Sequence, residues 1–175
     1  FGGRHTLSAL YAPLTLTAGG TLDADVHFAG ESFPAGTDVE GTYTFNSYRL
    51  TYRYTLKETE RFEAGIGFTG KIRDAAIKVE GGGVSAEKTN VGFVPLLNFR
   101  LKWMATDRID LILEGDALAA PQGRAEDVIA GILVDVTGNV QLRLGYRIVE
   151  GGADNDEVYN FALINYASAG LIVEF

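Results

Sequence analysis

Charged side chains recur at every second position of several segments, and arginine is the commonest base among them. The guanidinium group offers a rigid fork of donors that binds a carboxylate through two hydrogen bonds, which suits a water-poor interior. We therefore expect a salt-bridge network inside the fold, with a structural role. Its members would be Arg49, Arg53, Lys71, Arg73, Arg100, Lys102, Asp110, Glu114, Asp116, Asp127, Asp135, Arg143 and Arg147.

Catalytic and metal chemistry have little support in the sequence. An activated serine needs a histidine base and an orienting acid, and only His27, near Glu31 and Ser32, meets this requirement. A solvated loop histidine is the more common situation, so we expect no enzyme, and a lipid-modifying enzyme is the least favoured alternative. With two histidines and no cysteine, we also expect no metal site and no cofactor.

The overall charge and length narrow the class of protein. A formal net charge of -8 argues against a nucleic-acid partner, because phosphate binding needs a basic face. No run approaches the ~18 apolar residues of a transmembrane helix, so any membrane crossing would use strands. We expect one domain over residues 1–175. The start of the chain lacks a charged and then apolar leader, and we expect that a signal peptide has been removed.

Alternation of apolar and polar residues is the dominant pattern and predicts β-strands. Short segments join some strands, at 57–60, 105–107 and 137–139, and longer segments join others, at 18–38, 77–88 and 150–157. This asymmetry is typical of membrane barrels, with brief connections on one side and long loops on the other. The fold predicted is all-β: an eight-stranded antiparallel up-and-down transmembrane β-barrel. Its strands would cover about 6–17, 47–56, 62–73, 90–103, 108–117, 127–136, 140–148 and 159–175.

Two details of this pattern carry their own predictions. A weaker alternation at Leu22, Ala24, Val26 and Phe28 suggests a strand extension or a hairpin within the first long loop. Pro95 lies in the apolar phase of the fourth strand, where it donates no ladder hydrogen bond, so we expect a bulge or local irregularity there.

The direction of the apolar phase distinguishes a membrane barrel from a soluble one. In a soluble barrel the apolar phase would point inward and the charged phase would be a solvated surface, which is the alternative here. The charged phase is rich in arginine and nearly balanced in sign, so we expect it to fill the lumen. Aromatic residues near the strand ends resemble the girdles of membrane barrels. The girdle residues are Tyr52, Tyr54, Trp103 and Tyr146.

The last segment, 166–175, ends on Phe175 with Val173 and Leu171 in the same phase. It resembles the C-terminal strand of bacterial outer-membrane proteins, whose terminal Phe is recognised by the barrel-assembly machinery. The whole chain is similar in strand count and loop rhythm to small OmpA-, OmpX- and OmpW-type barrels. The resemblance implies a Gram-negative outer membrane, contact with its lipid and lipopolysaccharide, and insertion by the assembly machinery. We expect a monomer.

Two functions stay open beside the less favoured lipid-modifying enzyme. The favoured one is a non-catalytic barrel with a largely closed lumen, serving a structural role or recognition through its loops. The alternative is an OmpW-like channel for small hydrophobic molecules, with Ile164, Tyr166 and Ile172 as an apolar patch, unless these residues simply pack in a core. The acidic loops could bind divalent cations, although solvated acids are the simpler interpretation. These acids are Asp23, Asp25, Glu31, Asp38, Glu40, Glu150, Asp154, Asp156 and Glu157.

Overall fold

The computed structural model describes residues 3–120, 123–155 and 158–175, and its regular structure is entirely β-strand. The registers between neighbouring strands are antiparallel. The prediction of an all-β, antiparallel chain is therefore confirmed. No helix in the described ranges has the length and apolar character needed to cross a membrane.

The strands differ widely in length. The three longest follow one another along the chain and contain 21, 20 and 21 residues. The complete series is β1 His5–Ala12, β2 Thr15–Thr21, β3 Val26–Phe28, β4 Glu31–Phe33, β5 Asp38–Glu58, β6 Phe62–Gly81, β7 Val84–Met104, β8 Ile109–Ala120, β9 Gly123–Thr137, β10 Val140–Asn155 and β11 Val158–Val173.

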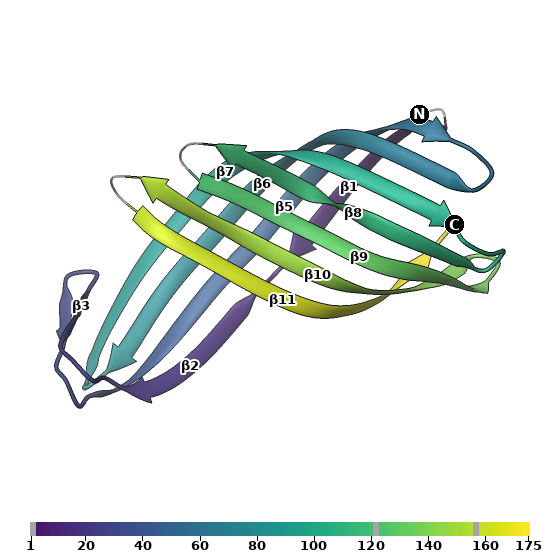
Figure 1. The fold of residues 1–175 in the computed structure, drawn as a ribbon. Coiled ribbons are helices and arrows are strands. Elements are labelled where there is room, and N and C mark those ends of the chain that lie inside the picture. Colours follow the sequence, from purple (N-terminus) through teal and green to yellow (C-terminus); the bar gives the residue numbers. More distant parts are fainter. Residues whose placement is uncertain (1–2, 121–122, 156–157) are drawn as a thin grey trace. The chain divides into compact units, whose positions relative to one another are not determined.

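Most strands belong to one sheet with the order β1-β5-β6-β7-β8-β9-β10-β11, in which β2 also pairs with β5 (Figure 1). β1 and β2 are separated by Pro13 and Leu14, and the Leu14 carbonyl still accepts a hydrogen bond from Phe45 N at 2.8 Å. Pro13 has no N–H to donate, which explains why a single strand is interrupted there. The sheet thus has eight neighbouring positions, as many as the predicted strands.

Two of the three predicted long loops are in fact strand. The segment 77–88 contains the end of β6 and the start of β7, joined by a turn at Gly82 and Gly83. Both glycines have positive φ, +60° and +81°, which is the backbone of a tight hairpin turn. The segment 150–157 is occupied by β10 up to Asn155, while residues 156 and 157 lie outside the described ranges.

The first long loop does carry a hairpin of its own, as one of the two alternatives predicted. β3 and β4 pair from Val26 with Phe33 to Phe28 with Glu31. Phe33 is only 1% exposed, so this small hairpin is anchored by a buried aromatic ring.

Pro95 lies within β7, which continues through it as a strand. The register of β7 with β8 begins at Leu97 opposite Ala117 and runs without a shift to Met104 opposite Asp110. The proline therefore precedes this ladder, so its missing N–H removes no hydrogen bond from it. Because this register does not include Pro95, the irregularity expected at this position stays a prediction.

The chain divides into two compact units, and the long strands contribute to both. Unit 1 contains residues 1–8, 51–69 and 95–175, which include β8 to β11 and the turns at 59–61, 105–108 and 138–139. Unit 2 contains residues 9–50 and 70–94, which include β2, the β3–β4 hairpin and the turn at Gly82 and Gly83.

Candidate functional site

The two faces of the sheet have the reverse of the exposure found in soluble proteins. Phe68 and Leu171 are 68% and 70% exposed, whereas Lys71 and Asp127 are 5% and 6% exposed. Charged residues are almost never buried in soluble proteins unless they are paired. We call the side that carries Tyr48, Leu50 and the alternate residues of neighbouring strands the belt face, and the opposite side the ion-pair face.

Arg147 and Asp127 form the most complete ion pair on the ion-pair face. Nε and Nη2 of Arg147 donate to the two carboxylate oxygens of Asp127, at 2.7 and 2.6 Å. The Arg147 guanidinium also lies 5.7 Å from the centre of the Tyr166 ring. Two parallel hydrogen bonds give such a pair both strength and a fixed orientation. The pair joins β9 to β10, while the ring comes from β11.

Glu114 accepts two arginines. Arg143 Nη2 donates to its Oε1 at 2.6 Å, and Arg100 Nη1 lies 3.5 Å from its Oε2. Arg100 is directly opposite Glu114 in the β7–β8 ladder, but Arg143 reaches it from β10, across β9. Gly131 lies on β9 between the positions opposite Glu114 and Arg143, so no side chain blocks this path.

Gly131 is also packed against its own ladder. A Cβ there would overlap the carbonyl oxygen of Leu144 on β10. We expect Gly131→Ala to destabilise the folded chain by about 1–3 kcal/mol, the usual cost of overpacking. Urea titration of the protein in lipid vesicles would measure this change. Gly170→Ala on β11 is the control, because nothing lies within 4 Å of its Cβ position, and equal stability losses in both variants would contradict the prediction.

Asp116 is the centre of a buried hydrogen-bond chain in unit 1. Thr69 Oγ1 donates to Asp116 Oδ1 at 2.6 Å, and Asn98 Nδ2 donates to the same oxygen at 2.8 Å. Thr51 extends the chain through a hydroxyl contact of 2.7 Å with Thr69. Asn98, Thr51 and Thr69 were absent from the predicted site, although they alternate with apolar residues in the same phase as the charges. Small polar side chains thus complete the network around the ions.

The remaining predicted bases of unit 1 have different surroundings. Lys102 Nζ lies 3.5 Å from Asp110 Oδ2. The two residues form a diagonal cross-strand pair, because Lys102 is directly opposite Ile112. Arg53 packs its aliphatic stem against Gly65, where a Cβ would lie 3.0 Å from Arg53 Cδ. Glycine therefore makes room for arginine on the neighbouring strand.

Three predicted bases belong wholly to unit 2. Arg49 Nε donates to Ser47 Oγ at 2.9 Å, and Lys71 Nζ lies 4.8 Å from the centre of the Phe45 ring. Arg73 Nη2 donates to Asn90 Oδ1, and its guanidinium would touch a Cβ on Gly92. These contacts are to a hydroxyl, a ring and an amide, and both Arg49 and Lys71 have further interactions besides them. The pairing of these bases with acids stays a prediction.

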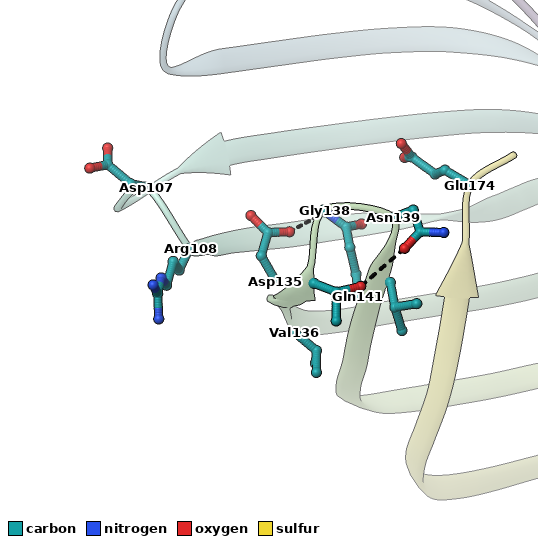
Figure 2. Close-up of a pocket in the computed structure, with 10 residues that line it drawn as sticks. Asp107, Arg108, Asp135, Val136, Gly138, Asn139, Gln141 and Glu174 are labelled. Carbon is teal, nitrogen blue, oxygen red and sulfur yellow. Dashed lines mark hydrogen bonds between the residues drawn. The ribbon is translucent and has the colours of Figure 1, made fainter.

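Asp135 is wrongly assigned to the buried network. Its side chain is exposed and accepts a hydrogen bond from Gln141 Nε2 at 2.7 Å, beside the turn at Gly138 and Asn139 (Figure 2). The register between β9 and β10 shifts at Val140 and Gln141, so Gln141 is opposite Asp135 at a bulge. Asp135 keeps the alternating phase of Leu133, because the register shift lies beyond it, and its exposure follows from its place at the end of the regular ladder. This carboxylate lines a polar hollow with Asp107, Arg108 and Glu174 (Figure 2).

The four predicted girdle residues are on the belt face. Tyr52, Trp103 and Tyr146 are exposed, and Tyr54 is half-buried with its ring edge-on to His5, the ring centres 5.1 Å apart. At the C-terminus Leu171, Val173 and Phe175 are exposed as well. A further aromatic pair was missed: Tyr11 stacks on Tyr48 with ring centres 4.9 Å apart in unit 2.

The polarity of both faces changes along the three long strands. On β5 the belt face carries Asp38, Glu40, Thr42, Thr44 and Asn46, and then apolar and aromatic residues from Tyr48 to Leu56. The belt face of β6 changes from apolar to polar at Asp74, and that of β7 changes from polar to apolar at Val91. We call the parts before or beyond these changes the outer segments: 38–46 of β5, 74–81 of β6 and 84–90 of β7. Their opposite face is mainly apolar, with Lys88 and Asn90 as its charged and amide members on β7. Its apolar residues are Val39, Tyr43, Phe45, Ala75, Ile77, Val79, Val84 and Ala86.

The polar side of the outer segments forms contacts typical of solvated sheets. Thr21 donates to Asp38 at 2.5 Å, and Lys78 lies 2.8 Å from Glu80. The hydrogen bond to Glu80 raises the pKa of the Lys78 ammonium group above its ordinary value. This exposed pair is worth little for stability.

The loop residues considered for catalysis or cation binding are placed as follows. His27 Nδ1 lies 2.7 Å from Ser32 Oγ as its cross-strand neighbour, whereas Glu31 is opposite Phe28. Asp25 caps the backbone N–H of Ala35 at 2.8 Å. No group of three metal-binding side chains occurs among the described residues, and the side chains of Asp154, Asp156 and Glu157 lie outside them.

No protein-family model, curated protein or solved structure matches the chain.

Proposed function

We propose that the chain is an integral outer-membrane β-barrel whose belt face contacts lipid and whose ion-pair face fills the lumen. The observation that carries the proposal is the reversed exposure: many large apolar side chains are exposed, while Arg49, Lys71 and Asp127 are over nine-tenths buried. A soluble protein would expose an apolar surface of this extent to water at a large cost in free energy. A bilayer removes that cost.

The lengths of the belt support the same proposal. The apolar part of β5, from Tyr48 to Leu56, matches the ~9–11 residues that a tilted strand needs to cross the hydrocarbon. The whole of β5 contains 21 residues, which extend over ~70 Å at ~3.3 Å per residue. The outer segments would then stand outside the membrane, where their polar side meets water.

Closure would join the two ends of the sheet order, β1 and β11, and would leave no open edge inside the lipid. The proposed protein is a monomer, inserted through its C-terminal strand and surrounded by lipid and lipopolysaccharide. Ion pairs such as Arg147–Asp127 and Arg143–Glu114 would close the lumen. Its role would be structural, or recognition through the outer segments, without catalysis.

Gel mobility and conductance test this proposal. A folded membrane barrel refolded into detergent should migrate faster in an unheated gel than after boiling. In planar bilayers the closed lumen should show no steady open-pore conductance. A chain that stays soluble and monomeric without detergent would contradict the membrane assignment, and a stable large conductance would contradict the closed lumen.

A further inference from the structure

We infer that the apolar side of the outer segments binds an amphiphile with one acyl-like chain and a single anionic head. This inference rests on the proposed function, because it requires the outer segments to stand in water. Tyr43, Phe45, Ile77 and Val79 on this side are half-buried, not fully covered. These side chains continue the ion-pair face, so apolar walls lead directly to the cationic part of the same face.

Two cationic side chains at the inner end of this surface would bind the anionic head of the amphiphile. Lys71 Nζ lies against the Phe45 ring at 4.8 Å, so a positive charge touches the apolar wall itself. Arg73 is at the next alternate position of β6, and its Nη2 donates to Asn90 Oδ1. Its Nε is buried and has no hydrogen-bond acceptor in the described part of the chain. A buried donor of this kind gains from an acceptor, and most from a charged one.

The choice of occupant follows from the kind of surface. An extended peptide would bind a sheet edge through backbone hydrogen bonds, whereas this surface is a sheet face lined mainly by apolar side chains. The hairpin of the first loop already has its anchor, Phe33, buried at 1% exposure. An acyl chain needs only apolar contact, and a carboxylate head would meet Arg73. We therefore commit to a fatty-acid-like carboxylate.

Fluorescent cis-parinarate and its methyl ester test the inference with the full chain in lipid nanodiscs. The carboxylate should bind more tightly than the neutral ester. Arg73→Gln should weaken the carboxylate about tenfold, since a hydrogen bond to a charged group is lost, and should leave the ester within about twofold. The isosteric Val79→Thr should weaken both probes about threefold or more, because a hydroxyl replaces a methyl group on the wall.

Lys78→Gln is the matched control, since Lys78 is on the same strand but on the belt face. It should leave the binding of both probes unchanged. Equal affinity of the two probes for the unmodified chain, or equal losses for both probes in Arg73→Gln, would overturn the inference. If the chain inserts, shifts on heating and yet does not bind parinarate, only this inference fails. If it does not insert at all, the proposed function fails with it.

Discussion

Replacement of Phe68 by arginine is expected to destabilise the membrane-inserted chain by about 2–4 kcal/mol. Phe68 is 68% exposed and lies near the middle of the apolar part of β6, so the proposed barrel places it deep in the hydrocarbon. A guanidinium there would lose its hydration or distort the bilayer around it. Urea unfolding from vesicles would measure the change in the free energy of unfolding.

The matched control for this variant is Thr89→Arg. Thr89 is exposed on the belt face of β7, but it lies in the outer segments, beyond the change to apolar residues at Val91. The cost there should be below about 1 kcal/mol, as at a membrane interface. On a soluble sheet both positions would be ordinary surface sites, and both changes would stay within about 0.5 kcal/mol. Near-equal, small effects would therefore contradict the lipid-facing belt.

Replacement of Glu114 by glutamine should cost about 3 kcal/mol or more. Glu114 neutralises both Arg100 and Arg143, and its side chain is only 17% exposed, so in the proposed barrel the variant leaves two partly buried arginines without their carboxylate. The charge of the carboxylate is removed while its size is kept. Thermal unfolding followed by the heat-dependent gel shift would show the loss as a lower transition temperature.

A double-mutant cycle separates the ion pair from other effects of this change. Arg143→Gln in the Glu114→Gln background should cost much less than Arg143→Gln alone, with a coupling energy above about 0.5 kcal/mol. Glu126→Gln on β9 is the control, because Glu126 is exposed and should change stability by less than about 0.5 kcal/mol. Strictly additive losses would show that the pair carries no stabilisation of its own.

Alternation predicted the strands and their antiparallel arrangement because it depends only on neighbouring residues. The exact strand ends were harder, since Gly81 to Val84 looks like loop composition and becomes a two-residue turn through positive φ at Gly82 and Gly83. The extra length of β6 and β7 follows from that turn. Asp135 has the phase of Leu133, but it lies at the end of the regular β9–β10 ladder, where its side chain is exposed. Alternation predicts the phase of a residue and not how far it lies from the strand end.

Much of the candidate site was visible as residue types but not as pairs. The phase of Arg147 and Asp127 is plain in the sequence, yet their pairing depends on the β9–β10 register, which places Arg147 opposite Ile129. The role of Gly131 depends on the same register. In contrast, the polarity change between Asn46 and Tyr48 is present in the sequence itself. The change is easily overlooked, because apolar residues recur at every second position on both sides of it. Before the change they lie on the opposite face, and after it they lie on the belt face.

The fluorescence of Trp103 tests the central claim, that the belt face contacts lipid, most directly. It is the single tryptophan of the chain, lies on β7 and is 52% exposed. In vesicles of brominated phosphatidylcholine the emission should be blue-shifted and strongly quenched relative to unbrominated vesicles, while aqueous acrylamide should quench it weakly. Red-shifted emission that acrylamide quenches and brominated lipid does not would contradict the account.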